Sequence, residues 1–185
     1  MKIYFHLNTG GICNSYVVVN EETHEALIVD PGNLNPMMIN QIEDNHYKLT
    51  GVLITHNHPS HTNGLKTLMK IYSPKIYSSD WEIFDFTTTV ITGEGKVRVA
   101  GMTVNYYAVP GHTSDSIVFK IGNVLFTGDS LSAGKFGTTN SSYARHLLKS
   151  NLEEKILSQQ ENTVILPGHG PPSSIGAELN FNIHL

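Results

Sequence analysis

The strongest constraint in this sequence is a strand-like segment that ends in three histidines. Residues 49–55 read LTGVLIT, and their central run Val52-Leu53-Ile54 is apolar without alternation. Such a run is typical of a short strand that is buried on both faces. The segment His56-Asn57-His58-Pro59-Ser60-His61 follows directly. His56 and His58 stand two residues apart, so in an extended chain their side chains point to the same side and can converge on one ion.

Pro59 bends the chain, so we expect His61 near a neighbouring point rather than at the same one. The spacing differs from that of the zinc-binding helix HExxH, which has no match here. Three further β-rich segments end in a turn that carries one ligand-type residue beside glycine: His112 in Pro110–Thr113, Asp129 in Phe126–Ser130 and His169 in Leu166–Gly170. Glycine lets backbones approach closely, and neutral imidazole is the commonest biological metal ligand. Four strand ends with five histidines and one aspartate predict a metal site.

Each of these residues alone has an ordinary explanation. A single histidine after a strand is usually a loop or core residue, and Asp129 alone would suit a turn or a cap. Their joint occurrence at successive strand ends favours the metal site. The remaining histidines lack this context and are expected to be structural or solvated: His6, His24, His46, His146 and His184.

Length and composition narrow the class of protein. The 185 residues predict one domain, 1–185. With 39% hydrophobic residues and 16 glycines, disorder, collagen and coiled coil are excluded. A net charge of −4 gives no reason to expect nucleic acid. No apolar run approaches the ~18 residues of a membrane span, and the N-terminus lacks the apolar stretch of a signal peptide. We therefore expect a cytoplasmic protein with no membrane partner, in which the single cysteine, Cys13, is a buried, inert thiol.

Turn residues and β-branched runs predict a mixture of hairpins and helices. The expected hairpins pair Ser15–Val19 with Ala26–Val29, Val97–Ala100 with Val104–Tyr107, and Ile117–Lys120 with Val124–Thr127 around Gly122-Asn123. The expected helices are Pro36–Asn45, Gly64–Ile71, Asp80–Phe86 and Asn151–Gln159. The last two follow apparent capping boxes, Ser79-x-x-Glu82 and Ser150-x-x-Glu153.

Taken together, these segments resemble the metallo-β-lactamase superfamily, and within it the short single-domain proteins similar to glyoxalase II, the hydroxyacylglutathione hydrolases. The resemblance covers nearly the whole chain and rests on Asn14-Ser15-Tyr16, Leu27–Gly32, Thr55–His61, Pro110–Thr113, Thr127–Leu131, Ala133-Gly134 and Pro167–Pro171. It implies an α+β fold, a four-layer αββα sandwich of two facing sheets covered by helices, with metals along one edge.

The resemblance also implies roles for single residues. His56, His58 and His112 match the first metal site, His61 and His169 match the second, and Asp129 matches the bridging ligand. The family's HxHxDH motif has aspartate where this chain has Ser60. Asp129 and Ser60 are the expected catalytic residues, with Ser60 binding metal weakly or holding a water in place of the carboxylate. Zinc is the expected metal, one or two ions per chain, with iron or manganese as alternatives.

Other departures concern the substrate. Glyoxalase II continues into a helical domain that helps bind glutathione, whereas this chain ends sixteen residues after His169. The family's Gly-Arg-x-Asp segment is Gly137-Thr138-Thr139-Asn140 here. Lys135, Tyr143 and the aromatic stretch Trp81–Phe86 are candidate cleft residues, although surface or core packing would also explain them.

Three functions remain open. The first is a metal-dependent hydrolase of a small thioester or related ester that uses a metal-bound hydroxide. The second is a mononuclear iron enzyme similar to the persulfide dioxygenases, because His56, His112 and Asp129 form a set of two histidines and one carboxylate. The third is a catalytically weak metal-binding protein, a sensor or partner, because Ser60 replaces the aspartate. The first two imply a small-molecule substrate, and the sequence does not give the oligomeric state.

Overall fold

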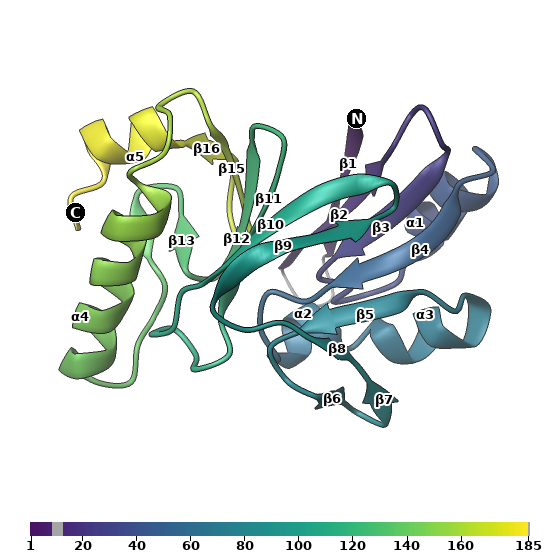
Figure 1. The fold of residues 1–185 in the computed structure, drawn as a ribbon, viewed down its shortest axis with the longest axis horizontal. Helices are drawn as coiled ribbons and strands as arrows, with labels where there is room; N and C mark the ends of the chain where they lie inside the picture. Colours follow the sequence, from purple (N-terminus) through teal and green to yellow (C-terminus); the bar gives the residue numbers. More distant parts are fainter. Residues whose placement is uncertain (9–12, 185) are drawn as a thin grey trace.

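Two six-stranded sheets form the centre of the molecule (Figure 1). The computed structural model describes residues 1–8 and 13–184. The first sheet has the order β1 (Lys2–Asn8), β2 (Cys13–Val19), β3 (Glu25–Val29), β4 (Lys48–Leu53), β5 (Lys75–Ser78) and β8 (Thr89–Val90). The second has the order β16 (Ser173–Ser174), β15 (Val164–Pro167), β12 (Val124–Gly128), β11 (Ile117–Ile121), β10 (Met102–Ala108) and β9 (Glu94–Val99).

Helices cover the outer face of each sheet, on opposite sides of the view in Figure 1. On the first sheet they are α1 (Pro36–Glu43) and α3 (Leu65–Ile71), with the short α2 (Pro59–Thr62) before α3. On the second they are α4 (Ser142–Asn151), which continues into the π-helical turn η1 (Leu152–Ile156), and α5 (Ile175–Phe181). Two short hairpins complete the fold, β6 (Glu82–Ile83) with β7 (Phe86–Thr87) and β13 (Leu131–Ser132) with β14 (Lys135–Phe136).

Three apolar clusters define the four layers. The inner faces of the sheets share one cluster, in which Tyr16 and Val18 of β2 join Phe119 and Phe126 of the second sheet. The alternate residues of β2 point outward to a second cluster beneath α1 and α3. A third cluster fills the space between the second sheet and α4 with η1. Because β2 is buried on both faces, all seven of its residues are buried. The expected αββα sandwich is confirmed.

Parallel pairing brings the carboxyl ends of several strands to one edge of the sandwich. In the first sheet β4 is parallel to both β3 and β5. In the second sheet β12 is parallel to β15. The segments that carry His56, Asp129 and His169 each follow the carboxyl end of one of these strands. This topology is what places the ligand-type residues near one another.

The three expected hairpins are present, but one helix prediction is wrong and another gives the wrong start. Residues 80–86 form the β6–β7 hairpin, in which Phe84 has a φ of 55° and its ring lies 4.0 Å from the Lys66 ammonium. This contact with α3 is a tertiary interaction, which outweighs the local capping signal. The helix predicted from Asn151 instead begins at Ser142, where the Ser141 side chain accepts a hydrogen bond from Ala144 N.

The later part of that helix is explained by its buried face. Leu148, Leu152 and Ile156 stand four residues apart and are all fully buried against the second sheet. Ser150 therefore lies inside a continuous helical segment rather than at its start. The sequence also gave no prediction for α5. Among the helices in the described part of the chain, none is both long and apolar enough to cross a bilayer.

Candidate metal centre

All five predicted histidines and Asp129 come together at one edge of the sandwich. His56 and His58 lie in the segment between β4 and α2, and His61 lies in α2. His112 comes from the connection between β10 and β11. Asp129 directly follows β12, and His169 follows β15. Their ligand atoms form two groups that share Asp129, within each of which all atoms lie within 4.8 Å of one another.

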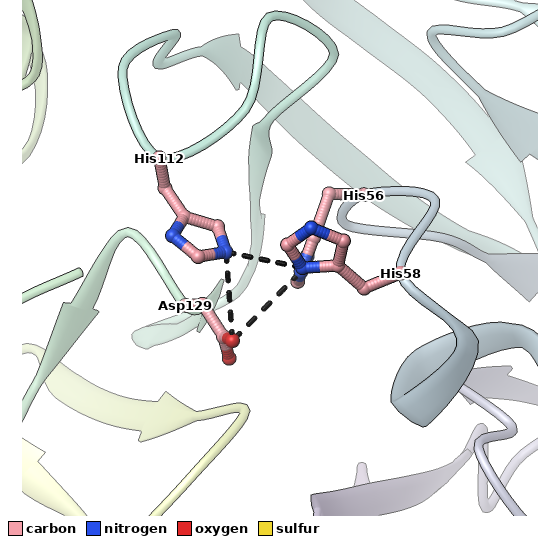
Figure 2. A group of neighbouring side chains, drawn as sticks. All are labelled: His56, His58, His112 and Asp129. Carbon is pink, nitrogen blue, oxygen red and sulfur yellow. Dashed lines mark hydrogen bonds and ion pairs between the residues drawn. The ribbon is translucent and has the colours of Figure 1, made fainter. Parts of the chain in front are cut away.

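We call the first group the four-donor cluster: His56, His58, His112 and Asp129. Figure 2 shows these side chains pointing toward a common centre. His58 Nδ1 lies 2.9 Å from His56 Nε2 and 3.2 Å from His112 Nε2. Asp129 Oδ2 lies 3.8 Å from His56 Nε2 and 3.6 Å from His112 Nε2.

We call the second group the three-donor cluster: His61, His169 and Asp129. His61 Nε2 lies 3.2 Å from Asp129 Oδ1, and His169 Nε2 lies 3.3 Å from Asp129 Oδ2. Each carboxylate oxygen therefore has a different set of imidazole neighbours. The His61 side chain is fully buried, whereas that of His169 is 35% exposed. Solvent reaches the centre from the His169 side.

Hydrogen-bond partners fix the orientation of three of these rings, and sequence reasoning assigned no role to any of them. Asp30 Oδ2 accepts a hydrogen bond from His61 Nδ1 at 2.9 Å and another from Thr55 Oγ1 at 2.7 Å. Thr55 Oγ1 lies 3.1 Å from His56 Nδ1. Because the Thr55 hydroxyl donates to Asp30, it accepts from the His56 ring. His56 and His61 are thus both anchored through one buried carboxylate.

The third anchored ring is His112, whose Nδ1 donates to the backbone oxygen of Thr138 at 2.8 Å. In each anchored histidine one ring nitrogen is engaged, and the other points into the cluster. A signal for Asp30 was present in the sequence, since this ligand-type residue directly follows the expected strand Ala26–Val29. For Thr138 there was none, because the acceptor is a main-chain oxygen brought in by tertiary folding.

The charges of the centre depend on burial and on these close contacts. Burial lowers the pKa of His56 to about 3, with the nearby His61 adding to the effect. Burial also lowers the pKa of His61, but the carboxylates of Asp30 and Asp129 outweigh it and raise that pKa to about 10. For Asp129, burial raises the pKa, and the His61 contact outweighs it and lowers the value to about 2. The centre thus holds an ionised carboxylate and a neutral His56.

The residues present fit a divalent metal. Among the described residues, the buried atoms His61 Nε2 and Asp129 Oδ1 form no hydrogen bond, although they lie 3.2 Å apart as an ion pair. Buried polar atoms are rarely left unpaired, and a cation between them would satisfy both. Ring nitrogens of His56, His58 and His112 also converge, and Asp129 is the only carboxylate in their group. Imidazoles with one carboxylate are a donor set typical of zinc and of non-haem iron.

Ser60 lies in α2 between His58 and His61 and is half-buried. Within the described part of the chain its hydroxyl makes no hydrogen bond, while its backbone oxygen accepts one from the Cys13 thiol at 2.7 Å. Cys13 is buried, as expected. A Cβ at Gly32 would lie 1.7 Å from Ser60 O and 2.5 Å from Cys13 Sγ, so only glycine fits there. Close packing therefore fixes the backbone of Ser60.

A cavity of about 180 Å³ opens beside the donors. It is lined by His112, Asp129, Ser132, Lys135, Phe136, Gly137, Thr138 and His169. Glu178, which is buried, holds the β13–β14 turn of this wall by accepting from Gly134 N at 3.0 Å and from Asn182 Nδ2 at 2.8 Å. Of the candidate cleft residues, Lys135 lines this cavity, and Tyr143 lines an adjacent one of about 200 Å³. Trp81–Phe86 lines neither.

The fold is an αββα sandwich with a cluster of histidines and an aspartate at the edge of its two sheets. This combination defines a class of metal-site proteins, and comparison with known sequences places the chain in the same class. The family model for the metallo-β-lactamase superfamily matches residues 8–87. An uncharacterized protein of Treponema pallidum is 30% identical over 177 residues, which are 94% of each chain. A hydroxyacylglutathione hydrolase of Chromohalobacter salexigens is 31% identical over 157 residues, 83% of this chain and 60% of that protein.

Solved structures give the same result. The B3 metallo-β-lactamase BLEG-1 matches with a TM-score of 0.86 and 25% identity over 98% of both chains. ETHE1 from Myxococcus xanthus matches with a TM-score of 0.86 and 24% identity over 99% of this chain and 84% of that one. This chain belongs to the metallo-β-lactamase superfamily, whose members are mostly hydrolases. It spans 60% of the length of the hydroxyacylglutathione hydrolases that it matches.

Proposed function

We propose that residues 1–185 act as one domain, a metal-dependent hydrolase that cleaves a small thioester or a related ester. The observation that carries this proposal is the pair of clusters sharing Asp129, because the two together offer five imidazoles and a carboxylate. The similarity to hydroxyacylglutathione hydrolases supports the thioester class of substrate.

In this proposal His56, His58, His112 and Asp129 hold one metal, and His61, His169 and Asp129 hold a second. Zinc fits these donors, and iron and manganese are the alternatives. A bound divalent metal would supply a water of lowered pKa and would polarise the substrate carbonyl. The remaining chemistry depends on groups of the chain itself.

Asp129 joins the two clusters, since each of its oxygens lies near different imidazoles. Asp30 keeps His56 and His61 in position through Thr55 and a direct hydrogen bond. Lys135 lies in the wall of the cavity beside Asp129, where an ammonium group favours substrate groups that carry or develop negative charge. Ser60, which directly precedes His61, has a hydroxyl but no negative charge, so in this proposal the second metal is held more weakly than the first.

The test is metal analysis of protein purified without added metal, followed by acyl-thioester hydrolysis on the same sample. We expect bound zinc and thioester turnover that a chelator abolishes and added zinc restores. The matched control is His146→Ala, which removes an exposed histidine of α4 outside both clusters. Bound metal without turnover of any acyl-thioester would contradict the hydrolase and favour a metal-binding sensor or partner.

A second candidate is an iron-dependent oxygenase that acts on a persulfide. The observation in its favour is that Asp129 Oδ2 faces both His56 and His112, which gives the two-histidine, one-carboxylate arrangement of non-haem iron oxygenases. Bound iron together with oxygen uptake on addition of a persulfide, and no thioester turnover, would establish this activity in place of the hydrolase.

A further inference from the structure

Another cavity lies at the opposite end of the sandwich from the donor clusters. Its volume is about 680 Å³, and its walls are Thr23, Glu25, Lys48, Leu49, Thr50, Ser73, Lys75, Tyr77, Arg98, Val99, Ala100 and Gly101. Glu25, Lys48 and Lys75 are the first residues of β3, β4 and β5. The donor His56 follows the other end of β4. At about 3.3 Å per residue, the two sites are roughly 20 Å apart. We call this cavity the strand-start groove.

Both sheets contribute to the strand-start groove. The second sheet supplies Arg98 and the turn between β9 and β10, which lies near β3 in Figure 1. Asn20 Nδ2 donates to Ala100 O at 3.3 Å and holds this turn. A Cβ at Gly51 would lie 2.2 Å from Val99 Cγ1, so β4 and β9 pack closely beneath the groove. The packing of the two sheets therefore fixes the shape of the groove.

The groove gathers positive charge in a protein with a net charge of −4. Lys48, Lys75 and Arg98 come from three different strands and are three of the 12 lysines and arginines. Glu25 is the one carboxylate in the wall. In the described part of the chain, none of the three cations forms an ion pair. All three side chains are exposed, so an anion bound in the groove would be attracted by their summed charge.

We propose that the strand-start groove binds a small phosphorylated molecule. A phosphate monoester carries close to two negative charges at neutral pH, so it can use several cations at once, whereas a single carboxylate carries one charge. The guanidinium group of Arg98 matches phosphate oxygens in pairs. Thr23 Oγ1 accepts from Glu25 N at 3.3 Å, so its O–H is available to donate. The volume of about 680 Å³ lies in the range of small-molecule sites.

The test measures binding of inorganic phosphate and of adenosine 5′-monophosphate to the purified protein by titration calorimetry at low ionic strength. Arg98→Gln and Lys75→Gln should each weaken binding about tenfold or more, because each removes a charge-assisted hydrogen bond. Glu25→Gln should tighten binding, because it removes the one negative charge in the wall. Lys70→Gln, a change at an exposed lysine of α3 outside the groove, is the matched control and should leave binding unchanged.

The two probes distinguish free phosphate from a phosphate ester, and tighter binding of the nucleotide would assign the rest of the groove to the organic part. Thermal unfolding of each variant without ligand shows whether it folds like the parent. Equal affinities for the parent and for folded Arg98→Gln and Lys75→Gln would overturn the proposal. Binding lost in Asp129→Asn but kept in these variants would also overturn it, because the phosphate would then sit at the donor clusters. This test is independent of hydrolysis.

Discussion

The four-donor and three-donor clusters share a carboxylate but differ in how complete they are. The four-donor cluster has three imidazoles around Asp129, with His56 and His112 each anchored by a hydrogen bond. The three-donor cluster has only two imidazoles, and one of them, His169, is partly exposed. The family motif would add a carboxylate at residue 60, where this chain has serine. One substitution thus makes a nearly symmetric pair of sites unequal.

The two clusters also differ in the pKa values of their buried histidines. His61 lies wholly buried between Asp30 and Asp129, and these carboxylates raise its pKa to about 10 against the effect of burial. His56, in the other cluster, has its pKa lowered to about 3, first by burial. A cation that binds at His61 must therefore displace a proton, whereas His56 is already neutral. Both the ligand count and the proton favour filling the four-donor cluster first.

The substitution with the largest expected effect abolishes metal binding at both clusters. Asp129→Ala deletes the one carboxylate that they share. We expect metal content to fall to near zero. Hydrolysis should fall by more than the ~10–100-fold that is typical when a residue hydrogen-bonded to a metal ligand is removed. Elemental analysis and thioester assays on the same sample measure both. Asp85→Ala, at an exposed position in the β6–β7 hairpin, is the control. An Asp129→Ala protein with full metal content would refute the shared-ligand assignment.

The next prediction tests directly whether the two clusters differ in metal affinity. His112→Ala should remove the first metal more completely than His61→Ala does, because the three-donor cluster is already the weaker site in the parent. In dilute metal the parent should hold about one ion per chain, and His61→Ala should lower that value little. Metal titration followed by gel filtration gives the stoichiometry. About two ions per chain in the parent under these conditions would show that the clusters are equivalent.

Asp30→Asn separates the clusters by a change outside both of them. The amide keeps the size of the side chain but loses the charge that faces His61 Nδ1 at 2.9 Å. We expect the affinity of the three-donor cluster to fall about 10–100-fold and that of the four-donor cluster to change less, since His56 is reached only through Thr55. Competition with a chromophoric chelator resolves the two affinities. Equal losses at both sites would mean that Asp30 only supports the fold.

The smallest expected change would restore symmetry. Ser60→Asp returns the carboxylate of the family motif beside His61. It should raise occupancy of the second site and increase thioester hydrolysis about tenfold through better orientation of the attacking water. Ser60→Asn, which adds similar bulk without charge, is the control. If occupancy rises and no thioester in the panel is hydrolysed faster, the interpretation of this protein as a glyoxalase-like hydrolase limited by residue 60 should be abandoned.

The sequence by itself predicted the class of fold and which histidines and aspartate come together at its edge. Val52-Leu53-Ile54 indicated a strand buried on both faces, and the glycine-flanked residues at later strand ends identified Asp129 and His169 before any contact was known. These signals are local. A run of apolar residues indicates a buried strand, and a ligand-type residue directly after a strand is expected at the edge of the sheet. For the same reason the hairpins around Gly101 and Gly122 were predicted correctly, since both glycines take the positive φ that tight turns require.

Tertiary structure decided what depends on neighbours that are distant in the sequence. It brought Asp30, Thr55 and Thr138 behind the donor rings, and it placed Lys48, Lys75 and Arg98 in one groove. It also turned residues 80–86 into a hairpin and started α4 at Ser142, because contacts with α3 and the second sheet outweighed the capping signals at Ser79 and Ser150. Ring orientation and charge balance follow from packing between strands and helices, which no local pattern encodes.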